Sequence, residues 1–500
     1  MSQDHPVLRQ RGVGLEPGAE ALRAWLDRAA RFVVEGIEAL PETSAQGMAG
    51  AAALEVAEAC SRPISEEGLE GGLEASLEVL AEAIPASFQT AGPGYLAYIP
   101  GGGIPAAALA DLLADSANRF TGITAAAAAL VRLEGDVLRW LCREFGYGPE
   151  AYGLLTPGGS SANFSAFVAA RVDRLADDGD YRRAIAYTSS QAHHSVHKSL
   201  HLTGIPRSNV RAVPIDGRYR MRADVLAQMI ADDKAAGLQP FLVCAAAGTT
   251  NTGAIDPLSE ISDVCEREQL WFHVDGAYGG AFVLCEDGRQ RLAGIERADS
   301  ITFDPHKGMF LPYGTGCLLV RRLQTLRAAH PSQGDYLQDF EAFERRGEVP
   351  APADIGPELS RDYRGLRLWL PLMLHGAAAF RKALSEKLEL AALIDEGLEA
   401  LIARGLPIEQ VDRAQLSLST FRLSRRAGEP LAQWNSRNAT WMNAINERGR
   451  AYLSSTALPL QGESEGAFTL RTCVLSFRTH RVHIERLLED LAATARELSS

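Results

Sequence analysis

Two short segments near the middle of the chain place an acid and an amine directly after predicted strands. Asp275 closes an apolar stretch that contains Trp271 and Phe272, and Lys307 follows the apolar stretch 300–303. Strands of an α/β sheet deliver the residues that follow them to a common edge. The pattern therefore predicts that a carboxylate and a primary amine act on the same ligand.

An amine and a carboxylate at one sheet edge are what the chemistry of pyridoxal 5'-phosphate (PLP) requires. The amine forms a Schiff base with the cofactor, and the carboxylate keeps the pyridine nitrogen protonated so that the ring accepts electrons. Either residue alone is more often a surface charge or a helix cap. The prediction therefore depends on further residues that follow in the expected order.

A turn rich in glycine and serine offers a place for the phosphate. After Leu154 and Leu155 the chain reads Thr-Pro-Gly-Gly-Ser-Ser, and a helix is expected to start near Ala162. Glycines let the backbone approach an anion closely, and Ser160 and Ser161 supply hydroxyl groups in front of a helix N-terminus. Taken alone, the segment is explained equally well by an ordinary turn before a capped helix.

Two more predicted strands carry polar residues to the same edge. His193 follows the strand 184–187 and is placed to stack on a cofactor ring, although an isolated histidine is more often a surface or cap residue. Thr250 lies in a polar loop after the strand 241–244. Loops that converge in this way are typical of ligand sites in open α/β sheets.

In these motifs the chain resembles the group II PLP-dependent amino-acid decarboxylases, the family of aromatic-L-amino-acid, histidine and glutamate decarboxylases. The similarity extends from about Gly94 to Ser476. It is carried by His193, Thr250, a His-Val-Asp-x-Ala-Tyr element and a Pro-His-Lys element, all in family order. The last two elements are highly specific when they occur together.

The resemblance implies the α/β architecture of PLP fold type I, which is aspartate-aminotransferase-like. A large domain with a mainly parallel seven-stranded sheet is expected at 91–370, and a small α+β C-terminal domain at 371–500. A helical N-terminal arm is expected at 1–90, where stretches such as 19–37 and 73–84 are amphipathic. Family members wrap this arm over a second subunit, so a homodimer with shared active sites is implied.

The resemblance also implies roles for individual residues. Lys307 would hold the internal aldimine, Asp275 would pair with the pyridinium nitrogen, and His193 would stack on the ring, which makes these three the catalytic candidates. The other cofactor-binding candidates are Ser160, Ser161 and His306 at the phosphate, Thr250 beside the ring and Ala277 beneath it. The substrate-binding candidates are Tyr98, Ile99, Thr121, Ile123 and Arg471.

The implied reaction is decarboxylation of an L-amino acid to an amine, with CO2 release through a quinonoid intermediate. Aromatic-acid members carry a tyrosine in a mobile loop that protonates the substrate carbon. Aligned backwards from Leu359, that position falls at Pro352 or a neighbour, and Tyr336 is the nearest tyrosine upstream. His194 or Tyr336 is an alternative proton donor.

Loss of the loop tyrosine is associated in this family with oxidative chemistry that gives an aldehyde, ammonia and hydrogen peroxide. An aldehyde synthase is therefore the first alternative, and another fold-type-I reaction is the second. Ile99, Thr121 and Ile123 replace bulkier residues of aromatic-acid decarboxylases. This difference has two possible explanations. The substrate is non-aromatic, or the three residues differ only in how they pack.

Composition narrows the function classes. A formal net charge of −13 over 500 residues argues against general affinity for nucleic acid or anionic membranes. Seven cysteines with no CxxC pair are typical of a reduced, cytoplasmic protein. No apolar run approaches the length of a membrane span, and no metal site is expected, since His193, His194 and His197 are better explained by the cofactor or by solvent.

Overall fold

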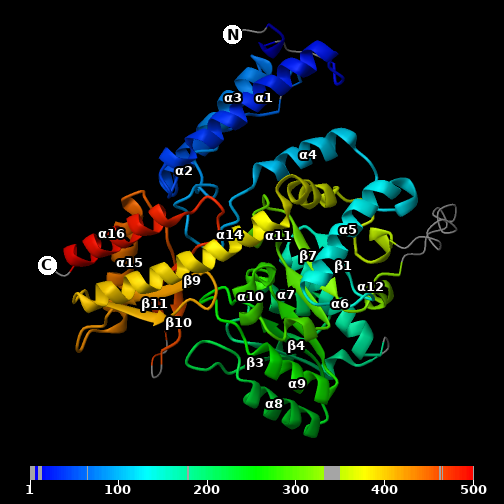
Figure 1. The fold of residues 1–500 in the computed structure, drawn as a ribbon, viewed down its shortest axis with the longest axis vertical. Coiled ribbons are helices and arrows are strands. Elements are labelled where there is room, and N and C mark those ends of the chain that lie inside the picture. The colour runs from blue at the N-terminus through cyan, green and yellow to red at the C-terminus, as the bar shows by residue number, and fades with distance from the viewer. Residues whose placement is uncertain are drawn as a thin grey trace.

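The computed structural model describes residues 6–9, 14–64, 66–176, 179–331, 349–460, 463 and 465–498. They form a seven-stranded sheet with helices packed against it, a smaller four-stranded sheet and a helical arm at the N-terminal side (Figure 1).

The large sheet confirms the predicted α/β fold of type I. Its strand order is β1 (Tyr152–Thr156), β7 (Gly316–Val320), β6 (Ser300–Phe303), β5 (Trp271–Asp275), β4 (Gln239–Ala246), β2 (Ala184–Ser189) and β3 (Val210–Val213). Strand β7 is antiparallel to both of its neighbours, and the other paired neighbours are parallel. Every residue of β1, β2, β5, β6 and β7 is buried, which explains their short apolar sequences.

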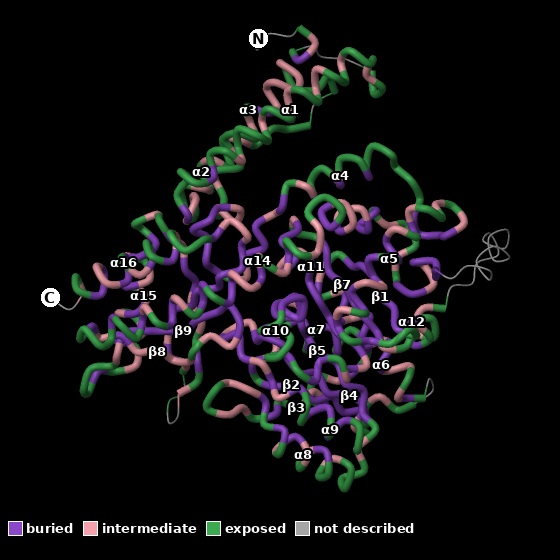
Figure 2. The backbone as a smooth tube through the Cα atoms, in the orientation of Figure 1, coloured by how far each residue is buried: buried purple, intermediate pink, exposed green. Residues whose placement is uncertain are grey.

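Helices enclose this sheet and form one continuous hydrophobic core with it (Figure 2). They are α4 (Pro105–Ala117), α5 (Ala128–Glu144), α6 (Gly159–Arg174), α7 (His194–Leu202), α8 (Ala223–Ala235), α9 (Leu258–Glu268), α10 (Glu286–Arg291), α11 (Pro305–Gly308) and α12 (Leu323–Ala329). Helix α5 buries Val137, Leu138 and Leu141, which recur at helical spacing.

Helix α14 (Arg364–Ala403) joins the two sheets. It contributes Leu368 to the core of the large sheet and Ile394 and Leu398 to a second core around the small sheet. Gly376 interrupts it with φ 72° and ψ 154°, a conformation that glycine adopts without the steric cost other residues meet. The proposed division at 370/371 falls inside this helix, six residues before the break.

The second core is built from an antiparallel sheet and two further helices. The strands, in spatial order, are β10 (Ser454–Leu458), β11 (Ala467–Cys473), β9 (Leu418–Leu423) and β8 (Ile408–Asp412). The helices are α15 (Leu431–Glu447) and α16 (Arg481–Glu497).

The arm consists of α1 (Ala19–Ala39), α2 (Ala51–Cys60) and α3 (Gly72–Ala83), and it projects away from the two sheets (Figures 1 and 2). Arg28 of α1 and Glu74 of α3 form an ion pair at 2.9 Å. No residue of α1 is buried. The arm therefore has little apolar core of its own.

Two features of the described ranges bear on function. No helix there is both long and apolar enough to cross a lipid bilayer. Within the same ranges, no group of three or more His, Cys, Asp or Glu side chains is arranged to hold a metal ion.

Candidate active site

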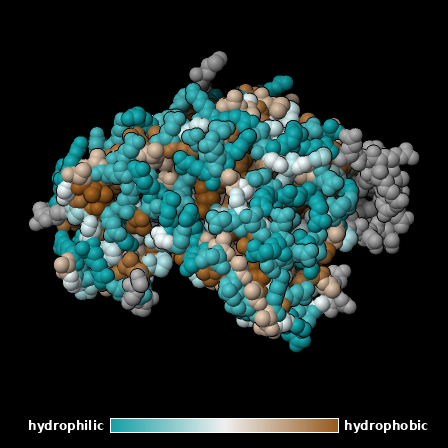
Figure 3. Space-filling model, turned by 60° about the horizontal axis from the view of Figure 1, so that its bottom comes forward, coloured by the Kyte–Doolittle hydropathy of each residue, from teal (hydrophilic) through white to brown (hydrophobic). Residues whose placement is uncertain are grey.

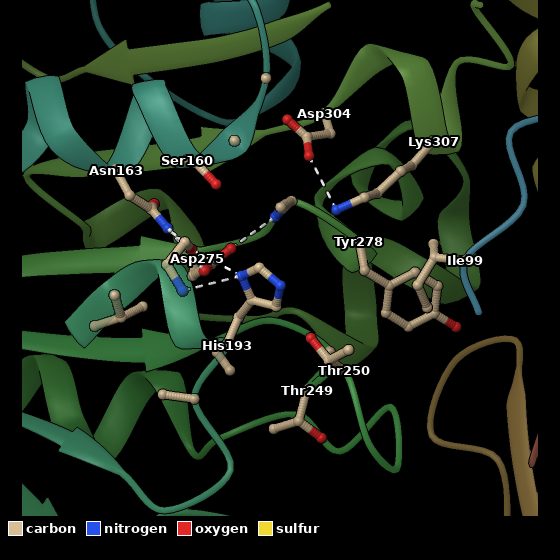
Figure 4. A pocket seen from close by; sticks show the side chains of 18 of the residues that line it. Ile99, Ser160, Asn163, His193, Thr249, Thr250, Asp275, Tyr278, Asp304 and Lys307 are labelled. Carbon is tan, nitrogen blue, oxygen red and sulfur yellow. Dashed lines mark hydrogen bonds and ion pairs between the residues drawn. The ribbon is translucent and has the colours of Figure 1, made fainter. Parts of the chain in front are cut away.

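A cavity of about 580 Å³ lies where the carboxyl ends of several large-sheet strands meet. Residues expected from the sequence reach it from different strand ends (Figure 4). Ser160 follows β1, His193 follows β2, Thr250 follows β4, Asp275 ends β5 and Lys307 follows β6. Loops from neighbouring strands converge at this edge of an open α/β sheet.

Lys307 lies on α11, a single helical turn that begins directly after β6. Its Nζ is 2.9 Å from Oδ2 of Asp304, a carboxylate with only 3% of its side chain exposed. Gly308 packs so closely on Ala281 that any side chain at position 308 would collide with it. This contact fixes the turn and therefore the place from which the lysine enters the cavity.

Asp275 presents a buried carboxylate to the cavity (Figure 4). Its Oδ1 accepts a hydrogen bond from the backbone N–H of Ala277 at 3.1 Å. Its Oδ2 accepts one from Nδ2 of Asn163 at 3.0 Å. Donors of this kind favour the ionised form of a carboxyl group and fix its orientation.

His193 stands before the first turn of α7 and caps that helix with its ring. Nδ1 accepts from the backbone N–H of Ser195 at 3.3 Å and lies 2.8 Å from the hydroxyl of Ser195. Burial lowers the pKa of His193, because an imidazolium is poorly solvated there, although the charge of Asp275 opposes the shift. The neutral ring therefore carries its proton on Nε2.

A helix N-terminus and two hydroxyl-bearing residues make the cavity suitable for an anion. Helix α6 begins at Gly159, earlier than the start expected near Ala162, so Ser160 and Ser161 lie in its first turn. A Cβ on Gly159 would lie 2.8 Å from Asp304, so only glycine leaves the required space. Unpaired N–H groups at a helix N-terminus bind phosphate readily.

His306 is oriented by the backbone. Its Nδ1 donates to the carbonyl oxygen of Thr315 at 2.6 Å, and its Nε2 lies 3.7 Å from Asp304. Burial lowers the pKa of His306, so the ring is neutral near pH 7. The cavity thus combines a lysine, a buried carboxylate, a neutral histidine and a helix N-terminus, and these groups fit PLP.

The remaining expected residues divide into two groups. Ser161, Ala277 and His306 line the cavity, as do Tyr98 and Ile99. Tyr98 has a φ of 52°, in the left-handed region that costs a tyrosine energy, and such strain is often found at functional sites.

Three substrate-binding candidates do not line the cavity: Thr121, Ile123 and Arg471. Thr121 and Ile123 are buried in their own chain. Arg471 is buried in β11 and donates from Nη2 to the carbonyl oxygen of Tyr98 at 3.2 Å, so it lies behind a lining residue. Burial lowers the pKa of this guanidinium.

The expected loop position and the two alternative proton donors lie in different places. Pro352 begins the short helix η9 (Pro352–Asp354) and is buried, and Ala353 donates its backbone N–H to Gly122 at 3.1 Å. His194 is exposed with its ring centroid 4.0 Å from that of His193, and it does not line the cavity. Tyr336 lies outside the described residues.

Comparison with known proteins identifies the family. Residues 76–423 match the model of the pyridoxal-dependent decarboxylase conserved domain. The chain is also 35% identical over 407 residues to the aromatic-L-amino-acid decarboxylase of Bacillus atrophaeus, a match that covers 81% of this chain and 82% of that protein. The chain belongs to the pyridoxal-dependent decarboxylase family.

Other relatives of this decarboxylase include enzymes with two kinds of product. The phenylacetaldehyde synthase of Arabidopsis thaliana is 28% identical over 438 residues, covering 85% of this chain and 86% of that one. The structure of Oryza sativa TDC with PLP and tryptamine has a TM-score of 0.87 at 25% identity, covering 97% and 99% of the two chains. The decarboxylase is therefore a PLP-dependent carboxy-lyase that acts on an amino acid.

Several residues of the decarboxylase site were not foreseen. Asn163 and Asp304 occur inside segments that were singled out, but no role was expected for either. Asn163 occupies the α6 position that faces Asp275, and Asp304 lies one helical turn before Lys307. Tyr278 and Tyr313 also line the cavity. Tyr278 is the last residue of the His-Val-Asp-x-Ala-Tyr element, and the signal for the other three residues was their proximity in sequence to the motifs.

Proposed function

We propose that this decarboxylase converts an L-amino acid with a neutral, aromatic side chain into the corresponding amine. The supporting observation is the charge of the cavity lining. Among the described lining residues of the chain, Lys307 is the one lysine or arginine, and Asp304 already pairs with it. Within this described lining, no second lysine or arginine is present to neutralise an acidic substrate side chain.

The uncharged part of the lining also favours this class. Tyr98, Ile99, Tyr278 and Tyr313 line the cavity. The ring of Tyr98 lies 6.4 Å from that of Phe88, at the edge of an aromatic cluster. Aromatic rings pack well against such surfaces.

Within this proposal, Lys307 would hold PLP through its side-chain amine. Bound PLP supplies an electrophilic carbonyl and a ring that accepts the electrons left by departing CO2. The carboxylate of Asp304, 2.9 Å from Nζ, is placed to pair with the amine of Lys307 and to orient it in the cavity.

Asp275 and His193 are proposed to act on the ring. The carboxylate of Asp275 would hold a proton on the pyridine nitrogen, and the neutral imidazole of His193 would cover the ring. Ala277 and Thr250 complete the walls of the cavity, and Ser160, Ser161 and His306 bind the phosphate. Arg471 is proposed to support the substrate pocket from behind Tyr98, whose carbonyl it holds.

We also propose that the enzyme is a homodimer with shared active sites. Helix α1 exposes Leu22, Leu26, Val33 and Val34, with exposed fractions of 43% to 52%, on an arm with almost no core of its own. In contrast, the face in Figure 3 is mostly hydrophilic with small apolar groups. A second subunit would cover the apolar side chains of the arm and bring its own residues to the active site.

A cytoplasmic location is part of the same proposal. All seven cysteines are free thiols, and six of them are buried. Disulfides are rare in reducing compartments, and buried thiols serve there as small apolar side chains.

One observation favours the oxidative alternative. The segment 349–360, which contains the expected loop position, has no tyrosine, and Pro352 is held in a buried turn. An aldehyde synthase would use one O2 and one water per amino acid and release CO2, ammonia, hydrogen peroxide and the aldehyde. Relatives with this activity by name match over most of their length.

A product assay on the PLP-loaded protein tests the proposal. Aromatic, acidic, basic and aliphatic L-amino acids are incubated separately, and amine, aldehyde and peroxide are measured together. An aromatic amine without peroxide is expected. Equal amounts of aldehyde and peroxide would establish the oxidative reaction, and amine formed mainly from an acidic substrate would overturn the proposed substrate class.

A further inference from the structure

Asn163 is a buried asparagine beside the proposed cofactor site, and every donor and acceptor of its amide forms a hydrogen bond. Asn163 is 1% exposed, and its Nδ2 donates to Asp275 at 3.0 Å and to the hydroxyl of Ser195 at 3.1 Å. Its Oδ1 accepts from the hydroxyl of Thr302 at 2.6 Å and from Nε2 of His273 at 3.1 Å. An amide with two donors and two acceptor sites has no remaining freedom to flip.

The protonation state of His273 follows from its surroundings. The ring is fully buried, and burial lowers the pKa of His273 to about 4, since no solvent stabilises an imidazolium there. The neutral ring has one proton, and it must be on Nε2 because Oδ1 of Asn163 can only accept. Nδ1 therefore accepts from the hydroxyl of Ser300, 2.8 Å away.

The chain of hydrogen bonds has one direction throughout. Nε1 of Trp271 can only donate, and it donates to Ser300 at 2.8 Å, which turns the serine proton toward His273. The hydroxyl of Ser300 then donates to Nδ1 of His273, and Nε2 of His273 donates to Oδ1 of Asn163. Nδ2 of Asn163 finally donates to the carboxylate of Asp275. Chains of aligned hydrogen bonds strengthen one another in a low-dielectric interior.

A side branch reaches the other ring-contacting residue. The hydroxyl of Ser195 accepts from Asn163 and so directs its own proton to Nδ1 of His193. The same amide thus orients the carboxylate proposed to face the pyridine nitrogen and sets the tautomer of the histidine proposed to cover the ring.

We propose that Asn163 and His273 are positioning residues, which hold the carboxylate of Asp275 in place to face the cofactor ring through a directed hydrogen-bond chain that starts at Trp271. The proposal rests on the proposed role of Asp275. It predicts that the function depends on the N–H at the position of His273 Nε2 and not on the imidazole itself.

Two substitutions at position 273 separate these possibilities. His273→Gln can place an amide N–H near the position of Nε2, whereas His273→Asn reaches only the position of Nδ1 and leaves Asn163 without that donor. With bound PLP, His273→Gln is expected to keep the wild-type visible absorbance and a kcat within about threefold. His273→Asn is expected to lower kcat by about 10- to 100-fold and to change the absorbance. Losses of this size are found when the hydrogen-bond partner of a metal-binding residue is removed.

Asn163→Asp provides an independent test. It replaces the donor facing Asp275 with a second carboxyl oxygen, and two carboxylates at this distance share a proton, so Asp275 loses part of its charge. The matched control is Asn438→Asp. Asn438 is fully buried in the small-sheet core and bonds only to backbone groups of Leu423 and Trp434.

Both asparagine variants are expected to lower the melting temperature, but only Asn163→Asp should alter the absorbance and its pH dependence. Equal spectra for the two folded variants, or equal effects of His273→Gln and His273→Asn, would overturn the inference. Asp275→Asn is measured in parallel. If that variant also retains wild-type turnover, the proposed role of Asp275 fails; if it alone loses activity, only the positioning chain fails.

Discussion

The edge of the large sheet and the N-terminal arm place their side chains in opposite environments. At the sheet edge, polar groups are buried, and Asp275, Asn163 and Lys307 all have partners from their own chain. In the arm, apolar side chains are exposed, and no residue of α1 is buried. The described polar groups at the sheet edge are therefore paired within one chain, whereas the apolar side chains of α1 remain exposed in it.

The two regions therefore depend on different kinds of contact. Buried polar groups are costly unless every donor and acceptor is paired, so the sheet edge depends on individual atoms. Exposed apolar side chains gain by being covered over an area, so the arm depends on the sum of many contacts. Substitutions in the two regions should consequently change different observables.

The largest effect is expected from Lys307→Ala. Removing the amine prevents covalent attachment of PLP, so the visible absorbance of the lysine-bound cofactor should disappear and turnover should fall by at least about a thousandfold. Absorbance spectroscopy and a coupled CO2 assay measure both. A variant that keeps the wild-type absorbance would show that another residue binds the cofactor.

Asp275→Asn should have the next largest effect. The amide cannot stabilise a proton on the pyridine nitrogen, so kcat should fall about 100-fold or more while PLP remains bound. Steady-state kinetics with cofactor-binding measurements test this separation of chemistry from binding. An unchanged kcat would mean that the carboxylate does not face the ring nitrogen.

Substitutions in the arm should change the oligomeric state of the protein. In the pair of substitutions Val33→Asp and Val34→Asp, a dimer interface would have to bury unpaired carboxylates, so the mass in solution should fall to the 53.9 kDa of one chain. Activity at the same concentration should fall to about a tenth or less, as shared sites separate. Sedimentation equilibrium measures the mass, with exposed Glu38→Gln on the same helix as the control. A dimer that survives both charges would place the interface elsewhere.

The smallest effect is a pH dependence of stability from His273. Its folded-state pKa of about 4 lies below the ordinary value of 6.5, so the unfolded chain takes up the proton first as pH falls. Stability is unaffected above about pH 6.5, and by pH 4 the loss reaches roughly 3 kcal/mol. Urea unfolding of wild type and His273→Gln at pH 7 and pH 4.5 measures the difference. Parallel losses in the two proteins would contradict this assignment.

Much of the large sheet could be predicted, because short apolar segments alternated with amphipathic helices. The strand expected at 184–187 is part of β2, that at 241–244 part of β4, and that at 300–303 corresponds to β6. Helix ends were less predictable. Helix α6 starts at Gly159, where the chain approaches Asp304 closely, and sequence periodicity contains no information on that contact.

The sequence by itself indicated the family of this protein and its cofactor, PLP. A lysine, an aspartate and a glycine-serine turn, each placed after an apolar strand, are local patterns that specify PLP and a sheet edge. Only the tertiary structure decided which groups support them. Asn163 lies more than a hundred residues from Asp275 and from His273, and the three meet because β5, β6 and α6 pack together. Hydrogen bonds between such distant segments depend on three-dimensional packing, which no local pattern records.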